Sequence, residues 1–518
     1  MDNKPEYHNP VFWVSVIVTT AFVIWGALSP DSLSNQATKL FNFTTINFGW
    51  LYLVSVLFFV LFLLYLAFSK YGKIRLGHDD ERPEYSFFTW IGMLFSAGFG
   101  VGLVFWGVAE PMEHFMNPPL KEMDPQTPES ARLAMRYSFF HWGVHQWSVF
   151  TVVGLALAYL QFRKNQKSLI SESFRVFSKT NSKPKFSKTI DTLAVIATVT
   201  GVATSLGLGI MQINGGMHYV FDTPNSAVSQ IVITVILTVL YTISSTSGLD
   251  KGIKILSNVN LALALGLMLL FLFLGPTVFI LNSLVVGIGD YIQHFFEMSL
   301  RLTPYQGGGK WIRDWTIFYW AWVIAWSPFV GSFVARVSRG RTVREFIIGT
   351  MIIPPALAAV WMAIFGGTAL HMDLFKGTKI AEAVQNDVTT ALFETFSYFP
   401  FDTVLSVLAI TLIFTFLITS ADSATFVLGM MTSKGTLHPN MPVKMIWGVL
   451  QASIAIVLII SSGLQGLQTA SLVTALPFTI ILIFMCFSIY KYFKQEPHIP
   501  KRQRVKKHKK KAETEAVE

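Results

Sequence analysis

The sequence predicts an all-α integral membrane protein with twelve transmembrane helices. Composition, the lengths of the apolar runs and the distribution of basic residues lead to this fold class. The chain has 518 residues, of which 52% are hydrophobic and 14% are charged, and its mean hydropathy is +0.50. Such a composition is typical of a protein embedded in a bilayer rather than of a soluble multi-domain protein.

Twelve apolar runs can be read along the chain, and most reach the ~20 residues needed to cross ~30 Å of hydrocarbon. They lie near residues 11–29, 49–68, 86–107, 138–162, 191–212, 225–245, 255–283, 314–335, 345–370, 401–430, 444–462 and 466–490. The segment before the first run, Met1–His8, is polar, and no small-residue cleavage site follows that run. We therefore expect the first run to be a membrane span rather than a secretory signal.

Basic residues predict the orientation. If the N-terminus lies in the cytoplasm, the segments on that side hold 31 of the 40 Lys and Arg residues. This positive-inside bias predicts that both termini are cytoplasmic and that the protein lies in the plasma membrane. The net charge of +10 is then a topology signal and not a sign of nucleic-acid binding. The single cysteine, Cys486, excludes an intrachain disulfide.

The first two spans are plain apolar helices, but the third contains Gly98, Gly100 and Gly102 in the stretch SAGFGVGLVFWGVAEP. Each glycine weakens a helix by ~1 kcal/mol relative to alanine. Irregular backbone at membrane depth is tolerated where it lines a cavity, which favours a site at this position. Close helix packing through the small residues Gly98 and Gly102 is the alternative that this segment leaves open.

The fourth span carries Trp142, Trp147 and Phe150, which fall within an arc of about 140° on a helical wheel. They predict either an aromatic wall or an interfacial aromatic belt. His141 and His145 are four residues apart and would suit a metal ion, but no third ligand is evident, so we expect no metal site.

The fifth span is rich in hydroxyl groups and glycine, beginning with Thr198. Such hydroxyls either bond back to the carbonyl four residues earlier or serve a hard cation that requires oxygen ligands. After the seventh span, we expect an outer, partly amphipathic connection near 282–300.

The eighth span has the most informative pattern. At helical spacing it places five aromatic residues on one stripe: Trp315, Tyr319, Trp322, Trp326 and Phe329. Ser327-Pro328 and Gly331 then weaken the helix, so we expect an interruption there. Helix packing is one interpretation of the inner pair Trp322 and Trp326, and a wall for a cationic ligand is the other.

The tenth span ends in ITSADSATFV, where Asp422 is the only acid that we place inside a span. An ionisable residue at this depth is costly unless it is paired or hydrated, so we expect a functional role. The last two spans look structural. The tail beyond residue 490 holds ten Lys and Arg and predicts either a solvated segment or one that binds anionic lipid.

The two expected interruptions, Gly98–Gly102 and Ser327–Gly331, lie five spans apart, so blocks 3–7 and 8–12 would be inverted copies. Paired broken helices of this kind point to the central site of a secondary transporter. The predicted units are the start with spans 1–2 (1–85), the first repeat (86–283), an outer connection (284–313), the second repeat (314–490) and the tail (491–518).

Four stretches resemble signatures of the betaine/carnitine/choline transporter family: WTIFYWAWVIAWSPFVGSFVARVSRGRTVREF, SAGFGVGLVFWGVAEP, HWGVHQWSVF and ITSADSATFV. The resemblance covers about residues 9–493. It implies twelve spans with a five-plus-five inverted repeat, uptake of a zwitterionic or cationic trimethylammonium solute, and assembly as a homotrimer.

The resemblance also implies a substrate site. Its members in this chain would be Trp142, Trp147, Phe150, Trp322, Val323 and Trp326, with Gly98, Gly100 and Gly102. Two positions depart from the glycine betaine pattern, since Phe150 stands where Tyr is expected and Val323 where a second Trp is expected. The loss of an indole matters more, because a desolvated cation–π contact reaches ~2 kcal/mol.

For the coupling ion, Gly102 is similar to the glycine of sodium-coupled members, whereas proton-coupled members have an acid there. The implied Na+ ligands are the main-chain carbonyls of Ser96, Phe99 and Phe416 and the hydroxyls of Thr419 and Ser420. A second Na+ site near Thr198 looks incomplete, because Val202 stands where Thr is expected. The basic tail resembles the osmosensing tail of some members.

The leading hypothesis is therefore Na+-coupled uptake of an osmoprotectant such as glycine betaine. Choline, carnitine or ectoine-type solutes are the alternatives, motivated by Val323. A membrane enzyme is disfavoured because no nucleophile–base pair or metal set is evident. A receptor-like osmosensor is disfavoured because only a short tail follows the last span.

Overall fold

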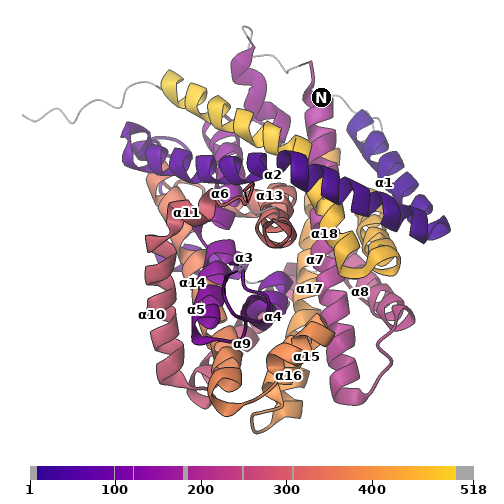
Figure 1. The fold of residues 1–518 in the computed structure, drawn as a ribbon. Coiled ribbons are helices and arrows are strands. Elements are labelled where there is room, and N and C mark those ends of the chain that lie inside the picture. Colours follow the sequence, from indigo (N-terminus) through magenta and orange to yellow (C-terminus); the bar gives the residue numbers. More distant parts are fainter. Residues whose placement is uncertain are drawn as a thin grey trace, which may run out of the picture.

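The computed structural model describes residues 9–98, 100–120, 122–178, 185–247, 250–305 and 309–496, and within them the protein is helical (Figure 1). The only extended pairing in these ranges is an isolated bridge between Arg75 and Thr342. The main helices are α1 (Pro10–Leu28), α2 (Pro30–Phe68), α3 (Phe87–Gly98), α4 (Val101–Met116), α5 (Pro128–Trp142), α6 (Val144–Ala158), α7 (Ser187–Phe221), α8 (Ala227–Ser247), α9 (Asp250–Leu274), α10 (Thr277–Gln293), α11 (Phe295–Ser299), α13 (Phe318–Val337), α14 (Val343–Lys376), α15 (Ile380–Asn386), α16 (Ala391–Phe396), α17 (Asp402–Thr432) and α18 (Met441–Gln495).

The expected number of spans can be compared with these helices. In the described ranges, 10 helical segments are long and apolar enough to cross a membrane. The expected third span is absent from this set because it is divided into α3 and α4. The last two expected spans are merged in α18, a 55-residue helix that turns at Gly463 (φ 56°). These two features account for the difference, and the count of twelve and the inverted repeat stay predictions.

The helix break in the third span is confirmed. α3 ends at Gly98, and Gly100 is extended (φ −156°, ψ 168°) before α4 begins at Val101. A second break, which the sequence did not predict, lies at Gly143 (φ −87°, ψ −150°) between α5 and α6. The single helical wheel drawn for Trp142 and Trp147 was therefore wrong, because the two residues lie on different helices.

The expected interruption at Ser327–Gly331 is also wrong. α13 stays helical from Phe318 to Val337, with Pro328 inside it, and the irregular part is a π-helical turn just before it (Arg313–Ile317). The seventh apolar run, 255–283, instead divides at Gly275–Pro276 into α9 and α10.

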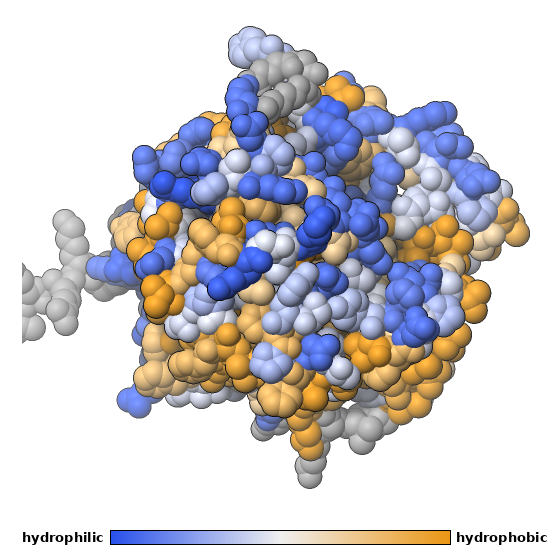
Figure 2. All heavy atoms as spheres, turned by 60° about the horizontal axis from the view of Figure 1, so that its bottom comes forward, coloured by the Kyte–Doolittle hydropathy of each residue, from blue (hydrophilic) through white to orange (hydrophobic). Residues whose placement is uncertain are grey.

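The outer surface of the bundle is apolar where lipid is expected. Large hydrophobic side chains are exposed on α1, α2, α8 and α10; Val285 of α10, for example, is 71% exposed. Figure 2 turns the end with α15 and α16 forward and shows hydrophilic side chains over the middle with hydrophobic atoms along the margin. This distribution fits a bundle that crosses a bilayer.

α13 lies in the interior and packs against α6, α7, α18 and α3; Figure 1 shows it nearly end-on. Glycine permits the close approach of its neighbours. A Cβ at Gly201 of α7 would lie 2.9 Å from the backbone nitrogen of Trp326. A Cβ at Gly331 would lie 2.7 Å from the side chain of Val153 on α6. The backbone around the aromatic stripe is thus held on two sides.

Candidate functional site

The aromatic stripe of α13 is confirmed as a continuous row of rings. Centroid separations along the row are 6.3 Å (Trp315–Tyr319), 6.0 Å (Tyr319–Trp322), 6.1 Å (Trp322–Trp326) and 5.9 Å (Trp326–Phe329). The five aromatic residues are four, three, four and three positions apart. Because this spacing averages close to the 3.6 residues of one helical turn, the rings stay on one face of the helix.

Rings from α5 and α6 meet this row and form an aromatic cage, which we define as Trp142, Trp147, Phe150, Trp322 and Trp326. Trp142 and Trp322 form a T-shaped pair with ring centroids 6.2 Å apart, and Phe150 and Trp326 form another at 5.7 Å. Trp147 contacts Phe150 at 5.3 Å. The structure therefore brings together the cage rings predicted from two distant segments, and Val323 is buried on α13.

The glycines of the third span close one side of the cage. A Cβ on Gly102 would lie 2.6 Å from the Trp322 ring and 3.2 Å from the Trp142 ring, so only glycine fits without displacing an indole. Gly100 is looser, since its nearest neighbour is Trp326 at 3.7 Å. Of Gly98, only the backbone at the end of α3 is described.

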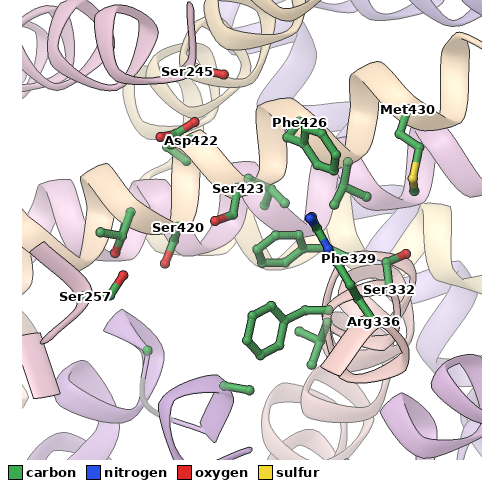
Figure 3. Close-up of a pocket in the computed structure, with 18 of the residues that line it drawn as sticks. Ser245, Ser257, Phe329, Ser332, Arg336, Ser420, Asp422, Ser423, Phe426 and Met430 are labelled. Carbon is green, nitrogen blue, oxygen red and sulfur yellow. The ribbon is translucent and has the colours of Figure 1, made fainter. Parts of the chain in front are cut away.

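A cavity of about 770 Å³ adjoins the cage at Trp326. Its lining includes Gly100, Gly102, Phe329, Phe416 and the hydroxyl-rich part of α17, and it reaches the surface at Leu437, which is 45% exposed. Figure 3 shows Ser420, Asp422 and Ser423 of α17 on one side and Phe329, Ser332 and Arg336 of α13 on the other. The cavity thus extends from the end of the bundle to the cage, with hydroxyl groups of α17 on one wall and aromatic rings of α13 on the other.

Three predicted sodium ligands lie on this cavity: Phe416, Thr419 and Ser420. The Thr419 hydroxyl donates to the Phe416 carbonyl over 3.1 Å and accepts from Asn260 Nδ2 over 3.2 Å. Phe99 lies outside the described residues, and of Ser96 only the helical backbone in α3 is described.

The predicted second-site residue, Thr198, is placed differently. It is fully buried, does not line the cavity, and donates to the Ala194 carbonyl four residues earlier over 2.7 Å. Val202 does line the cavity. The Thr198 hydroxyl thus bonds within its own helix, which is the first of the two interpretations given for the fifth span.

Asp422 lies on the cavity wall with only 4% of its surface exposed. Its Oδ2 accepts a hydrogen bond from the Ser244 hydroxyl over 2.7 Å. Lys444, which lines the same cavity, donates to the carbonyl of Ser245. The acid is therefore held in a hydrogen-bonded environment where α8 and α17 meet.

The amino-acid sequence that builds this site matches a known class of membrane protein. A family profile described as the betaine/carnitine/choline family transporters matches residues 10–498. The chain belongs to this transporter family. Among its relatives, an ectoine/hydroxyectoine transporter of Virgibacillus pantothenticus is 57% identical over 94% of this chain and 96% of its own length. The glycine betaine transporter OpuD of Bacillus subtilis is 48% identical over 95% of each chain.

A betaine/ectoine transporter of Corynebacterium glutamicum is 38% identical over 96% of this chain and 79% of its own. These relatives are transporters and not enzymes, and they confirm the family resemblance and the transporter class predicted from the four signature stretches.

One residue of this family member that the sequence did not single out is Glu110 on α4, a second deeply buried acid beside Asp422. Glu110 is fully buried and accepts from Trp142 Nε1 over 2.9 Å and from the Tyr319 hydroxyl. Its other oxygen lies 2.6 Å from His141 Nδ1 and 3.3 Å from His114 Nε2. The signal that could have found it is a carboxylate directly after the apolar run 86–107, on the helix that continues that run to Met116.

His141 and His145, the two histidines four residues apart, form separate hydrogen bonds. His145 uses both ring nitrogens, with Tyr291 at 2.9 Å and Ser299 at 2.6 Å. Ligand atoms of Glu110, His114 and His141 do lie within 4.8 Å of one another. However, two ligands on a tetrahedral zinc sit about 3.3 Å apart, and the 2.6 Å between Glu110 and His141 is a hydrogen-bond distance.

Proposed function

We propose that the protein takes up a small compatible solute with a cationic centre, that Na+ entry drives this uptake, and that ectoine-type solutes are preferred over glycine betaine. The cage supports the class of solute, because indole faces attract a desolvated cation. The observation that carries the preference is Val323, an aliphatic residue buried on α13 next to Trp322 where a further indole would complete a box.

A quaternary ammonium group is round and gains from aromatic faces on all sides. Ectoine carries its positive charge on a planar amidinium unit within a six-membered ring, so we expect it to need two opposed faces and to tolerate an aliphatic wall between them. The 57% identity to an ectoine/hydroxyectoine transporter supports the same choice.

Na+ coupling is supported by the oxygen-rich wall that adjoins the cage. Phe416, Thr419 and Ser420 line the cavity that also touches Gly102, and hydroxyl and carbonyl oxygens are the ligands that a hard cation requires. Because these Na+ ligands line a cavity next to the cage, Na+ binding can stabilise solute binding, and solute binding can stabilise Na+ binding.

We further propose that the cavity opens to the cytoplasm, that the chain forms a homotrimer in the plasma membrane, and that the basic tail binds anionic lipid and responds to osmotic stress. Glu496, the last described residue, supports the proposal for the tail, because its hydrogen bonds attach the start of the tail to the helical bundle. Burial acts to raise its pKa, but hydrogen bonds from Arg163, Lys164 and Tyr159 outweigh burial and lower the pKa to about 2. The contacts measure 2.6, 2.7 and 2.5 Å.

The test is uptake of labelled ectoine into proteoliposomes, with and without an inward Na+ gradient, and with unlabelled ectoine, glycine betaine, choline and carnitine as competitors. We expect Na+-dependent accumulation that ectoine inhibits most strongly. Trp322→Leu removes the central face of the cage and should abolish uptake while the protein still reaches the membrane. Unchanged uptake by this variant would contradict the cage assignment, and stronger inhibition by choline or carnitine would reassign the solute.

A further inference from the structure

The cage is connected to a buried negative charge. Glu110 contacts two aromatic residues at once, since its Oε2 accepts from the Trp142 indole and from the Tyr319 hydroxyl. Trp142 belongs to the cage, and Tyr319 contacts both Trp142 (5.8 Å) and Trp322 (6.0 Å). The Glu110 carboxylate therefore lies directly behind the wall that a cationic solute would face, and it is hydrogen-bonded to that wall through Trp142.

The surrounding contacts hold this carboxylate in its ionised form and in one position. All four partners of Glu110 present nitrogen or hydroxyl groups that can donate, so the anion is satisfied without a proton of its own. His141 is itself fixed, because its Nε2 bonds to Thr316 Oγ1 over 2.9 Å and its ring stacks on Tyr319 at 4.7 Å. The paired groups restrain the carboxylate; within this network of described residues, His114 Nδ1 has no hydrogen-bond partner.

We propose that Glu110 is a positioning residue of the solute cage, whose fixed charge makes the cage select a cationic head group over a neutral group of the same shape. This inference rests on the proposed function, because it concerns the same solute site. Glu110 acts through Trp142 and Tyr319 and does not touch the solute itself.

Two physical effects lead to this selectivity. The hydrogen bonds fix the tilt of the Trp142 indole, whose face or edge orientation decides whether a cation is attracted or repelled. The charge also acts directly, because an anion in a dry interior is weakly screened and attracts a nearby cation. Neither effect favours an uncharged solute.

The experiment uses the full-length chain in proteoliposomes and two inhibitors of labelled ectoine uptake. One is glycine betaine, and the other is 3,3-dimethylbutanoate, which has the same shape and carboxylate but a neutral quaternary carbon in place of nitrogen. We expect the wild type to prefer betaine. In Glu110→Gln that preference should fall about tenfold, the KM for ectoine should rise by a similar factor, and the maximal rate should change little.

Glu113→Gln is the matched control, because Glu113 lies on the same helix but bonds to Asn117 and Gln385 instead of to the cage. It should leave the betaine preference unchanged. Tyr319→Phe removes one donor and keeps the ring, so it tests the same network if Glu110→Gln does not reach the membrane; the preference should fall about threefold.

An unaltered preference in Glu110→Gln, or in Tyr319→Phe if that variant must replace it, would overturn the inference. Equal loss of affinity for both inhibitors would also overturn it, since that result indicates a purely structural role. If the wild type itself accumulates neither ectoine nor betaine, the proposed function fails. If the wild type accumulates them and the variants keep its preference, only the inference about Glu110 fails.

Discussion

Two segments of this transporter contain helix-weakening residues, and only one of them breaks. Between α3 and α4, the chain leaves the helix and Gly100 is fully extended. In α13, Ser327-Pro328 and Gly331 lie inside an unbroken helix of 20 residues. The comparison teaches that composition alone does not decide where a membrane helix breaks, because the neighbouring contacts decide whether the weakness is repaired.

The repair in α13 can be identified. Pro328 has no N–H, so the carbonyl of Ile324, four residues earlier, loses its usual partner. The Ser327 hydroxyl donates to that same carbonyl over 2.7 Å. Gly331 does not bend the helix; it allows α13 to pack closely against α6 at Val153 and Gly154. Gly102, by contrast, leaves room for two indole rings.

The largest expected effect comes from filling the space beside the break. Gly102→Val would place side-chain atoms where the Trp322 and Trp142 rings lie, at 2.6 and 3.2 Å from the new Cβ. We expect uptake to be abolished while expression is retained. Gly100→Ala is the matched control, because its nearest neighbour is 3.7 Å away and its extended backbone suits any residue. Equal loss in both variants would show that the break, and not the cage, requires glycine.

A smaller effect is expected on α13. Gly331→Ala would bring a Cβ within 2.7 Å of Val153 and 3.0 Å of the Gly154 nitrogen, so α6 and α13 must separate. We expect a loss of about 1–3 kcal/mol of stability, as in other overpacked interiors. Thermal unfolding in detergent measures it. Gly266→Ala of α9 has open space around it and should not destabilise the protein; a similar melting temperature for both variants would contradict the packing role.

The sequence predicted those features that depend on local periodicity and missed those that depend on distant partners. The ring row from Trp315 to Phe329 follows from helical spacing, and it is present. The break at Gly143 could not be predicted from one glycine, because the Tyr291 ring, which lies 3.0 Å from the position of a Cβ there, is contributed by α10. Glu110 was missed for the same reason, since its partners come from α5 and α13.

The smallest predicted effect tests the repair itself. Ser327→Ala removes the hydroxyl and leaves the Ile324 carbonyl without this donor, which should cost about 1 kcal/mol of stability. Pro328→Ala restores an N–H for that carbonyl, so the serine hydroxyl becomes redundant.

A double-mutant cycle measured by thermal unfolding therefore separates the two explanations. If Ser327 repairs the defect left by proline, Ser327→Ala should be costly in the wild type and nearly neutral in the Pro328→Ala background. Additive losses would show that the hydroxyl serves another contact. The helix would then owe its continuity to packing against neighbours such as α6, α7 and α18, and α13 would differ from the α3–α4 break only in what surrounds it.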